Sequence, residues 1–582
     1  MKEMKEMKEY PRGEYPRPMM VRDHWENLNG AWEFSFDEPA FDRQILVPFV
    51  YQCPKSGIGR KENHETVYYR KRFSWHKGQE NSRVLIHFGA VDYECDVWVN
   101  GEHVCHNTGG HLPFSAEITR CIKEHNELVV RVRDDHADLE KPRGKQCWTE
   151  KPGGIFYTPS TGIWQTVWLE EVPEEYIESI RWNTDYDTRT ARLCCKTSAA
   201  GTIRVKVSFE GRHICTVSSD AADKDGEVFI PLNHRVLDHW NFERFYAWAP
   251  EHPNLFDAEI EFLSREGRRD CVRSYFGIRT VSIENGMFCL NHRPCYQKLI
   301  LDQGYWPETL MTASEDEDFR EDIRLCKEMG FNGVRLHQKV EDPRFLYHAD
   351  RMGLLVWDEL PSAYVFSPDA VQRGCAEWTR QILRDVSHPC VVAWVPLNES
   401  WGVPQIEHDH TQQAYSVALY SIAKALDGSR PVISNDGWEH TQSDMLTVHD
   451  YRDAMGCDEG TYGSKATIVG RMPAERRLVA KGWHYEEQPI LISEFGGIAY
   501  QSREAEGWGY SRVQSARALE EGYRACVEPL LKESAVQGFC YTQLTDVEQE
   551  VNGLLTDRRE PKVPVERIRA INRVEKEVKN DD

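Results

Sequence analysis

The sequence predicts a multidomain protein with β and α/β parts: an N-terminal jelly-roll-like β-sandwich, an immunoglobulin-like β-sandwich and a C-terminal (β/α)8 TIM barrel. Two observations lead to this prediction. The chain has 582 residues, more than the roughly 250–300 residues that one hydrophobic core organises. Near residue 282 the pattern also changes, from short runs of alternating polarity to apolar strands separated by longer helical stretches. Such a change is typical of antiparallel sandwiches followed by βα units.

Residues 1–22 are expected to form a flexible N-terminal tail. The segment repeats a Met-Lys-Glu triplet and then becomes rich in proline, MKEMKEMKEYPRGEYPRP. It lacks the apolar stretch that a secretory signal needs. No run of about 18 apolar residues, the length of a membrane-spanning helix, occurs in the chain.

Two sandwiches are expected next, over residues 23–172 and 173–281. The first contains RVLIHF at 83–88 and ELVVRVR at 127–133, and the second contains TIRVKVSF at 202–209. Apolar and polar residues alternate in these runs, and turn signals such as Asn-Gly separate them, which is typical of antiparallel strands with one buried face. The second segment has about the size of one immunoglobulin-like domain.

Residues 282–582 are expected to form the barrel. Eight apolar strands alternate with helical stretches, and they are predicted at residues 296–301, 333–337, 354–359, 391–399, 431–435, 446–451, 489–494 and 538–543. Barrels of this kind carry their chemistry at the C-terminal ends of the strands. Polar residues at those ends are therefore the candidates for a functional site.

Charge and cysteine content exclude several classes of partner. The formal net charge is −23, and both nucleic acids and anionic membranes need a basic surface. The 17 cysteines are odd in number and contain no CxxC pair, so we expect reduced thiols and a cytoplasmic protein. A metal site and a cofactor are not expected, because no ligand spacing or phosphate-binding loop is found in the sequence.

Three of the predicted barrel strands end in a glutamate. The third ends in Asp358-Glu359, the fourth in Asn398-Glu399 and the seventh in Ser493-Glu494, and the last two are the candidate pair. Cleavage of a glycosidic bond needs one carboxylic acid to protonate the leaving oxygen and one carboxylate beside the anomeric carbon. Asn398 is expected at the same mouth, where it can bind a sugar 2-hydroxyl group.

These strand ends, together with YTPSTGIWQTVW at 157–168 and FGIR at 276–279, resemble glycoside hydrolase family 2, which includes β-galactosidases, β-glucuronidases and β-mannosidases. The resemblance covers about residues 23–565. It implies a sugar-binding-like first sandwich and a retaining double displacement, with Glu399 as general acid/base and Glu494 as nucleophile. Two carboxyl groups in a retaining enzyme lie about 5–5.5 Å apart.

Further site residues are expected at other strand ends. Arg335 and His337 lie in the last three residues of the predicted second strand, and Arg335 matches an arginine that the family places beneath the nucleophile. Tyr451 resembles the family tyrosine that donates to the nucleophile, and His449 is expected to bind glycone hydroxyl groups.

Four more residues are expected to line the sugar pocket. Asp302 and Trp306 follow the first strand, Trp438 follows the fifth, and Tyr541 lies in the eighth. The resemblance implies that Tyr541 stacks on the glycone. It also implies that residues 142–148 of the first sandwich form a loop that reaches the site.

The sequence departs from the family where the glycone is recognised. Family β-glucuronidases usually present an Asn-x-Lys motif to the sugar carboxylate, whereas residues 551–554 read VNGL. A buried carboxylate needs a cationic partner, so the prediction is an exo-acting, β-galactosidase-like enzyme. A β-glucuronidase or β-galacturonidase, an α-L-arabinosidase and a β-mannosidase remain alternatives, and so does a non-catalytic carbohydrate-binding protein. A glycoside is the expected partner, and a homo-oligomer is expected.

Overall fold

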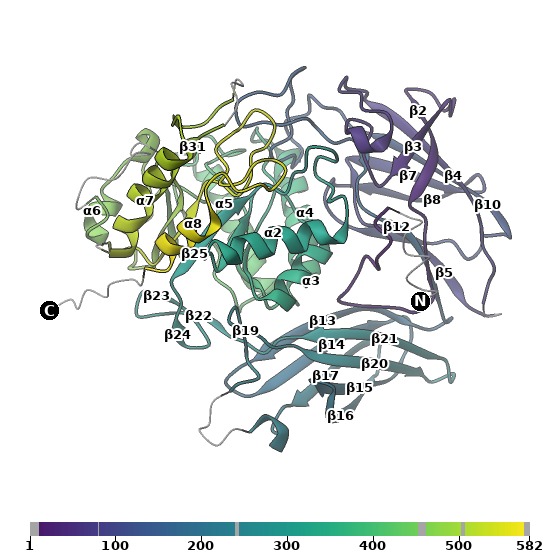
Figure 1. The fold of residues 1–582 in the computed structure, drawn as a ribbon. Helices are drawn as coiled ribbons and strands as arrows, with labels where there is room; N and C mark the ends of the chain where they lie inside the picture. Colours follow the sequence, from purple (N-terminus) through teal and green to yellow (C-terminus); the bar gives the residue numbers. More distant parts are fainter. Residues whose placement is uncertain are drawn as a thin grey trace.

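The computed structural model describes residues 11–78, 81–238, 244–451, 461–501, 507–532 and 534–574. In Figure 1 the first sandwich (purple) lies beside the barrel, and the second sandwich (blue to teal) lies below both. This order of two sandwiches and a barrel confirms the predicted fold class.

The first sandwich consists of a four-stranded and a six-stranded antiparallel sheet. In β10 the buried residues alternate with more exposed ones, as expected for a strand with one face on the core. The elements are β1 (Trp25–Asn27), β2 (Gly30–Phe36), β3 (Arg43–Val47), η1 (Pro54–Ser56), β4 (Thr66–Ser74), β5 (Arg83–Phe88), β6 (Val91–Asp92), β7 (Glu94–Val99), β8 (Glu102–Thr108), β9 (Phe114–Glu117), β10 (His125–Arg133), β11 (Gly162–Ile163) and β12 (Val167–Val172).

The second sandwich packs a three-stranded sheet on a four-stranded sheet, and a small three-stranded sheet leads from it into the barrel. Its elements are β13 (Ile177–Asp185), β14 (Thr190–Thr197), β15 (Gly201–Phe209), β16 (Arg212–Ala221), β17 (Asp225–Pro231), η2 (Arg235–Leu237), β18 (Trp248–Ala249), β19 (His252–Pro253), β20 (Phe256–Ser264) and β21 (Arg269–Phe276). The connecting strands are β22 (Val281–Glu284), β23 (Met287–Leu290) and β24 (Arg293–Pro294).

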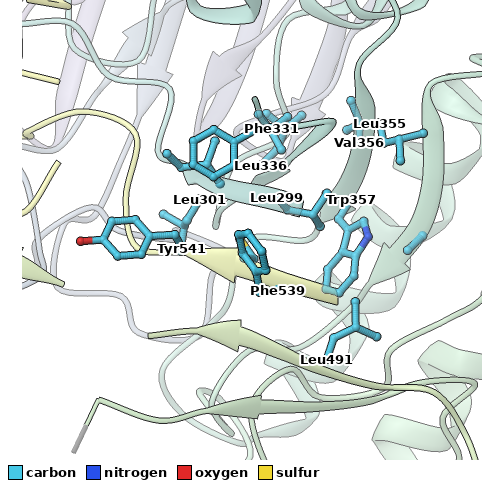
Figure 2. Close-up of a cluster of buried hydrophobic side chains, with 14 of the residues drawn as sticks. Leu299, Leu301, Phe331, Leu336, Leu355, Val356, Trp357, Leu491, Phe539 and Tyr541 are labelled. Carbon is cyan, nitrogen blue, oxygen red and sulfur yellow. The ribbon is translucent and has the colours of Figure 1, made fainter. Parts of the chain in front are cut away.

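The barrel contains a curled parallel sheet in the order β28-β27-β26-β25-β33-β30-β29. Its strands are β25 (Gln297–Asp302), β26 (Gly333–Leu336), β27 (Leu355–Glu359), β28 (Val391–Val395), β29 (Leu446–His449), β30 (Ile490–Glu494) and β33 (Gly538–Tyr541). Figure 2 shows part of the buried core around these strands, with Leu299, Trp357 and Leu491 among the side chains.

Helices surround this sheet. They are α2 (Asp316–Glu328), α3 (Pro343–Met352), α4 (Pro368–Asp385), α5 (His410–Leu426), α6 (Lys465–Val469), α7 (Ala516–Lys532) and α8 (Val565–Asn572), with short elements η3 (Pro473–Glu475), β31 (Ile498–Ala499) and β32 (Ser511–Arg512). None of the helices in the described part of the chain has the length and apolar character needed to span a lipid bilayer.

The predicted fifth strand is not formed as a regular strand. Residues 431–436 pair with the fourth strand only through two isolated parallel bridges, at Val432 and Asp436. The reason is that side chains accept the backbone N–H groups of this segment: Asp444 accepts from Val432 and Ser443 accepts from Ser434. Seven regular strands and this loosely paired segment therefore make up the barrel wall in the described residues.

Residues 11–22 are packed, so the prediction of a flexible tail is wrong for them; residues 1–10 lie outside the described part. Arg17 forms an ion pair with the buried Glu170 at 2.8 Å. Arg22 forms ion pairs with Glu170 and with Asp270 in β21. Met20 is 4% exposed and belongs to the core of the second sandwich. The sequence pattern gave no sign of this, because the segment is held by charges rather than by periodic apolar residues.

A cavity of about 320 Å³ lies between this N-terminal segment, the second sandwich and α3. Tyr15, Tyr275 and Arg351 are among its lining residues, and none of the polar strand-end residues of the barrel lines it. This cavity is therefore separate from the predicted site.

We predict that Arg22→Ala destabilises the protein, because it leaves two buried carboxylates without one of their cationic partners. The expected loss is about 3 kcal/mol, seen as a lower midpoint of thermal unfolding. Arg273→Ala is the matched control, since the Arg273 side chain is 59% exposed in its ion pair with Asp23 and exposed pairs contribute less than about 1 kcal/mol. Equal shifts for both variants would contradict the proposed anchoring.

Candidate active site

Charged and polar side chains from five barrel segments gather at the C-terminal mouth. Arg335 comes from β26, Glu359 from β27, His449 from β29 and Glu494 from β30. Glu399 follows β28. An oxygen of Glu399, a ring nitrogen of His449 and an oxygen of Glu494 all lie within 4.8 Å of one another.

Glu494 accepts hydrogen bonds on both carboxylate oxygens. Arg335 donates to Oε1 at 2.8 Å, and the Tyr451 hydroxyl donates to Oε2 at 2.6 Å. Tyr451 is itself held by the hydroxyl of Thr542 at 2.9 Å and by a stacked contact with Tyr510. The structure therefore places Arg335 and Tyr451 against Glu494, as the sequence predicted.

Arg335 is fully buried and binds four side chains. Its guanidinium group lies 2.7 Å from Glu359, 2.6 Å from Asp436 and 2.8 Å from Glu494. It also donates to Oδ1 of Asn398 at 2.7 Å. Burial alone would lower the pKa of Arg335, but the surrounding carboxylates raise it well above its usual range.

Glu399 lies in a strained turn. Glu399 and Ser400 have φ angles of 50° and 58°, in the left-handed region that non-glycine residues rarely adopt, at a cost of roughly 1–3 kcal/mol each. The surrounding side chains hold this conformation. The Ser400 N–H donates to Oδ1 of Asn435 at 3.0 Å, and its hydroxyl donates to the buried Glu439 at 2.6 Å.

His449 is buried between carboxylates. Its Nδ1 lies 2.8 Å from Oε1 of Glu399, and its Nε2 lies 3.2 Å from Asp436. Burial alone would lower the pKa of His449, but Glu494, Asp436 and Glu399 raise it to about 10. Burial would raise the pKa of Glu399, but the hydrogen bond from His449 lowers it. The prediction that His449 binds glycone hydroxyl groups is wrong, because carboxylates occupy both ring nitrogens and its side chain is 0% exposed.

Three other predicted pocket residues lie at the mouth. Asn398 is fixed through Oδ1 by Arg335. His337 is 2% exposed with Nδ1 3.2 Å from Glu359, and burial together with Arg335 lowers its pKa. Trp438 is partly buried, and its ring centroid lies 5.6 Å from that of His449.

Tyr541, Trp306 and Asp302 do not reach the catalytic cluster, so these predictions are wrong. Tyr541 packs against Tyr523 of α7 with ring centroids 4.8 Å apart, and Figure 2 shows it among buried hydrophobic side chains. Trp306 packs on Phe319 of α2.

The carboxylate of Asp302 accepts from the N–H of Gly304, and Cys326 and Asp322 of α2 lie within its electrostatic reach. Because side chains alternate along a strand, Asp302 at the end of β25 and Tyr541 at the end of β33 face the helices rather than the mouth, whereas Trp306 lies in the loop after β25. The strand pattern predicts how far along a strand such a residue lies but not which face it is on.

A loop of the first sandwich enters the site. Arg143 and Gly144 donate from their backbone N–H groups to Ser362, just after β27. Gly144 has φ +61°, and any side chain there would collide with the carbonyl oxygen of Gln338. Lys145 follows, 8% exposed, and it acts electrostatically on Glu399, His337 and Glu550.

Four partly buried aromatic rings stand next to this loop. Phe156 of the first sandwich contacts Trp401, two residues after Glu399, with ring centroids 6.2 Å apart. Trp148 and Tyr364 complete the cluster, with ring centroids 4.6 Å apart. Both domains therefore contribute to the wall beside Glu399.

A buried polar network follows β33. Glu550 accepts from the hydroxyl of Tyr157 at 2.5 Å and from the amide of Asn552 at 3.0 Å. Gln543 donates to Asn552 at 2.7 Å. Burial raises the pKa of Glu550, against the opposing effect of Lys145.

Sequence reasoning assigned no role to Glu359, Asp436 or Glu550. Glu359 ends a predicted strand, and Asp436 follows the segment predicted as the fifth strand, so the strand pattern already pointed to both. Glu550 lies in a loop outside the strand pattern, and its place follows only from the packing of the domains. Lys145 lies in the loop 142–148 that was expected to reach the site, but its electrostatic effect on Glu399 was not foreseen.

Two groups of three side chains in the described residues have a spacing that suits a metal ion. One is Glu399, His449 and Glu494, and the other is Asp350, His388 and Cys390. In both groups a histidine already donates to a carboxylate, at 2.8 Å from His449 and at 2.6 Å from His388. These side chains therefore form hydrogen-bonded pairs of their own.

We predict that Arg335→Met destabilises the protein in a pH-dependent manner. In the wild type, burial would raise the pKa of Asp436, but Arg335 and His449 hold it well below its usual range, so this stabilisation is present at neutral pH and is lost as the pH falls. Without Arg335 the buried carboxylates gain protons on folding, and the variant regains stability as the pH falls.

The difference in thermal unfolding between wild type and Arg335→Met, about 3–5 kcal/mol at pH 7.5, is therefore expected to shrink at pH 5. A difference that stays constant between these two pH values would contradict this account of the cluster.

The chain matches three models of one family in sequence. Residues 281–507 match the description "Glycosyl hydrolases family 2, TIM barrel domain", residues 175–279 match "Glycosyl hydrolases family 2", and residues 59–157 match "Glycosyl hydrolase 2 galactose-binding domain-like". Together the three cover most of the described chain.

Individual proteins are similar over long stretches. A β-galactosidase of Thermoanaerobacter pseudethanolicus is 28% identical over 423 residues, which are 70% of this chain and 53% of that protein. A β-glucuronidase of Rattus norvegicus is 25% identical over 501 residues, 78% of this chain and 71% of that protein. The chain spans about half the length of the first curated relatives it matches.

Solved structures share the fold. A β-D-glucuronidase from Dictyoglomus thermophilum superposes with a TM-score of 0.77 at 20% identity, over 97% of this chain and 99% of that chain. A β-galacturonidase from Eisenbergiella tayi superposes with a TM-score of 0.75 at 16% identity, over 97% and 100%. With three consecutive family models in the expected order, the chain belongs to glycoside hydrolase family 2.

Proposed function

We propose that the protein is a retaining, exo-acting glycoside hydrolase in which Glu494 is the nucleophile and Glu399 the general acid/base. The observation that carries this proposal is the pair of carboxylates at the barrel mouth, with oxygens within 4.8 Å of each other. Retaining enzymes hold their two carboxyl groups about 5–5.5 Å apart, whereas inverting enzymes need about 6.5–9.5 Å for a water molecule.

Glu494 has the surroundings of a nucleophile. Arg335 and Tyr451 each donate to one of its oxygens, and these two hydrogen bonds hold the carboxylate in a fixed orientation for attack. The carboxylate attacks the anomeric carbon and forms a glycosyl ester, and the bond to the leaving oxygen breaks. Asn398, fixed by Arg335, keeps its amide N–H groups available for the sugar 2-hydroxyl, a contact that strengthens in the transition state.

Glu399 protonates the leaving oxygen in the first step and takes a proton from water in the second. The aromatic rings of Trp401, Phe156, Tyr364 and Trp148 stand on the side of Glu399, which is where the leaving group departs. Aromatic rings suit both sugar and aryl leaving groups. A non-catalytic sugar-binding protein would have no need for two carboxylates in these different surroundings.

For the glycone we propose a neutral hexoside, with a β-galactoside first. The buried Glu550 and Asn552 occupy the segment after β33, where the family's glucuronidases carry a lysine. A carboxylate there accepts hydrogen bonds from sugar hydroxyl groups and repels a uronate. Lys145, buried near Glu550 and Glu399, supports a second candidate, a β-glucuronidase or β-galacturonidase.

Glu399→Ala and Glu494→Ala test the two roles. We expect turnover of a p-nitrophenyl glycoside to fall by about 10²-fold or more in each variant. Added azide should give a β-glycosyl azide with Glu399→Ala and the α-anomer with Glu494→Ala, as read by NMR. The reverse pattern would exchange the two roles, and wild-type rates in both variants would refute the mechanism.

A panel of p-nitrophenyl glycosides tests the glycone. The β-galactoside is expected to exceed the β-glucuronide and β-galacturonide by at least about tenfold in kcat/KM, the equivalent of one poorly paired charge. Glu550→Gln should raise the relative rate of the uronides, because it removes the repelling carboxylate. If the uronides are the best substrates and Lys145→Met abolishes their turnover, the second candidate is correct instead.

A further inference from the structure

The imidazole ring of His449 connects the two proposed catalytic glutamates. Nδ1 lies 2.8 Å from Oε1 of Glu399. Nε2 lies 3.2 Å from Oδ2 of Asp436 and 3.5 Å from Oε1 of Glu494. The ring is closely packed on two sides. It lies so near the backbone of Gly437 that any side chain there would collide with it, and the ring of Trp438 packs on it.

Charged side chains from several barrel segments face the His449 ring. Glu399 follows β28, Asp436 ends the segment that replaces the fifth strand, and Glu494 ends β30. Arg335 of β26 lies 3.4 Å from Nε2; this single cation shares Asp436 and Glu494 with the ring and also contacts Glu359.

Three more titratable groups lie farther away. Burial lowers the pKa of His337 and lowers that of His440 to about 4, so both rings are neutral. Lys145 acts on Glu399. Three carboxylates therefore contact one imidazole, and their excess negative charge favours the imidazolium form at neutral pH.

We propose that His449 is a positioning residue that stores the proton which Glu399 delivers to the leaving oxygen. This inference rests on the proposed function, because it assigns a source to the proton of that reaction. Nδ1–H points at Glu399, and Asp436 orients the ring through Nε2.

Every proton and bonding electron pair in the two steps can be accounted for. In the first step the Nδ1 proton passes to the carboxylate of Glu399, and the carboxylic acid so formed protonates the glycosidic oxygen. Glu494 forms its bond to the anomeric carbon while the bond to the leaving oxygen breaks, and that bonding pair stays on the oxygen. The products are the free alcohol, a glycosyl ester on Glu494, a Glu399 carboxylate and a neutral His449.

In the second step water attacks the anomeric carbon, and its proton passes through Glu399 back to Nδ1 of His449. The ester bond breaks, and its electron pair returns to Glu494. The contact between Nε2 and Glu494 couples these events. Ester formation removes one negative charge beside the ring, so the proton affinity of His449 falls at the moment when its proton is needed.

His449→Gln tests the proposal, because glutamine keeps a hydrogen-bond donor but stores no proton. Two substrates are compared: a phenyl glycoside, whose leaving group needs protonation, and a dinitrophenyl glycoside, whose leaving group does not. We expect kcat/KM to fall by about 10²-fold for the phenyl glycoside and by less than about fivefold for the dinitrophenyl glycoside. Equal losses for both substrates would overturn the proposal.

His440→Gln is the matched control. His440 is buried next to the same strand, and among the described residues its ring forms hydrogen bonds only with Thr447. A purely structural effect of replacing a buried histidine should change both substrates by the same factor in this variant. Unfolding midpoints of both variants show whether each is folded under the assay conditions.

The pH profile of the wild type tests the proposal without any variant. Since the imidazolium is the proton donor, kcat/KM for the phenyl glycoside should stay high through neutral pH and fall only as the pH rises toward about 10, the pKa of His449. In His449→Gln this fall of kcat/KM, the alkaline limb of the pH profile, should occur two or more pH units lower. A wild-type limb below pH 7, or a limb that the variant leaves in place, would overturn the proposal.

Failure of the proposed function gives a different result from failure of this inference. If neither substrate is hydrolysed by the wild type with any glycone, the glycosidase proposal itself fails. If both are hydrolysed and His449→Gln loses the same factor on both, the glycosidase proposal stands and the proton store is refuted.

Discussion

The guanidinium group of Arg335 is the interaction on which the mouth of the barrel depends. It binds Glu359, Asp436 and Glu494, which come from three different segments of the chain. Buried charges without partners cost several kcal/mol each, and this one cation is the shared partner of all three carboxylates. One arginine therefore fixes the proposed nucleophile relative to the other strand ends.

The same network gives the two glutamates different surroundings. Glu494 faces a guanidinium group and a tyrosine hydroxyl, whereas Glu399 faces the imidazole of His449, whose other ring nitrogen contacts Asp436. Two titratable groups whose environments differ in this way are suited to different tasks in one reaction. Asp436 joins the two halves, since it contacts both Arg335 and His449.

The fold and the centre of the site could be predicted because they follow from local pattern. Strand periodicity and a glutamate at two strand ends placed Glu399 and Glu494 at one mouth. The strand pattern does not say which face a residue at the end of a strand is on, and the resemblance assigned Tyr541 to the pocket although it packs on α7. The resemblance implied that the loop 142–148 reaches the site, but the pattern could not show its close contact between Gly144 and Gln338. The ion pair between Arg22 and Asp270 was not foreseen either, because it joins segments far apart in the chain.

Trapping of the covalent intermediate tests the central claim most directly. A 2-deoxy-2-fluoro glycosyl fluoride of the glycone that the enzyme turns over slows the second step more than it slows the first, and the glycosyl ester then accumulates. Peptide mass spectrometry of the inactivated protein should locate one sugar on Glu494. A label on Glu399, or turnover that stays complete without any label, would contradict the account of a retaining mechanism built around Arg335 and Glu494.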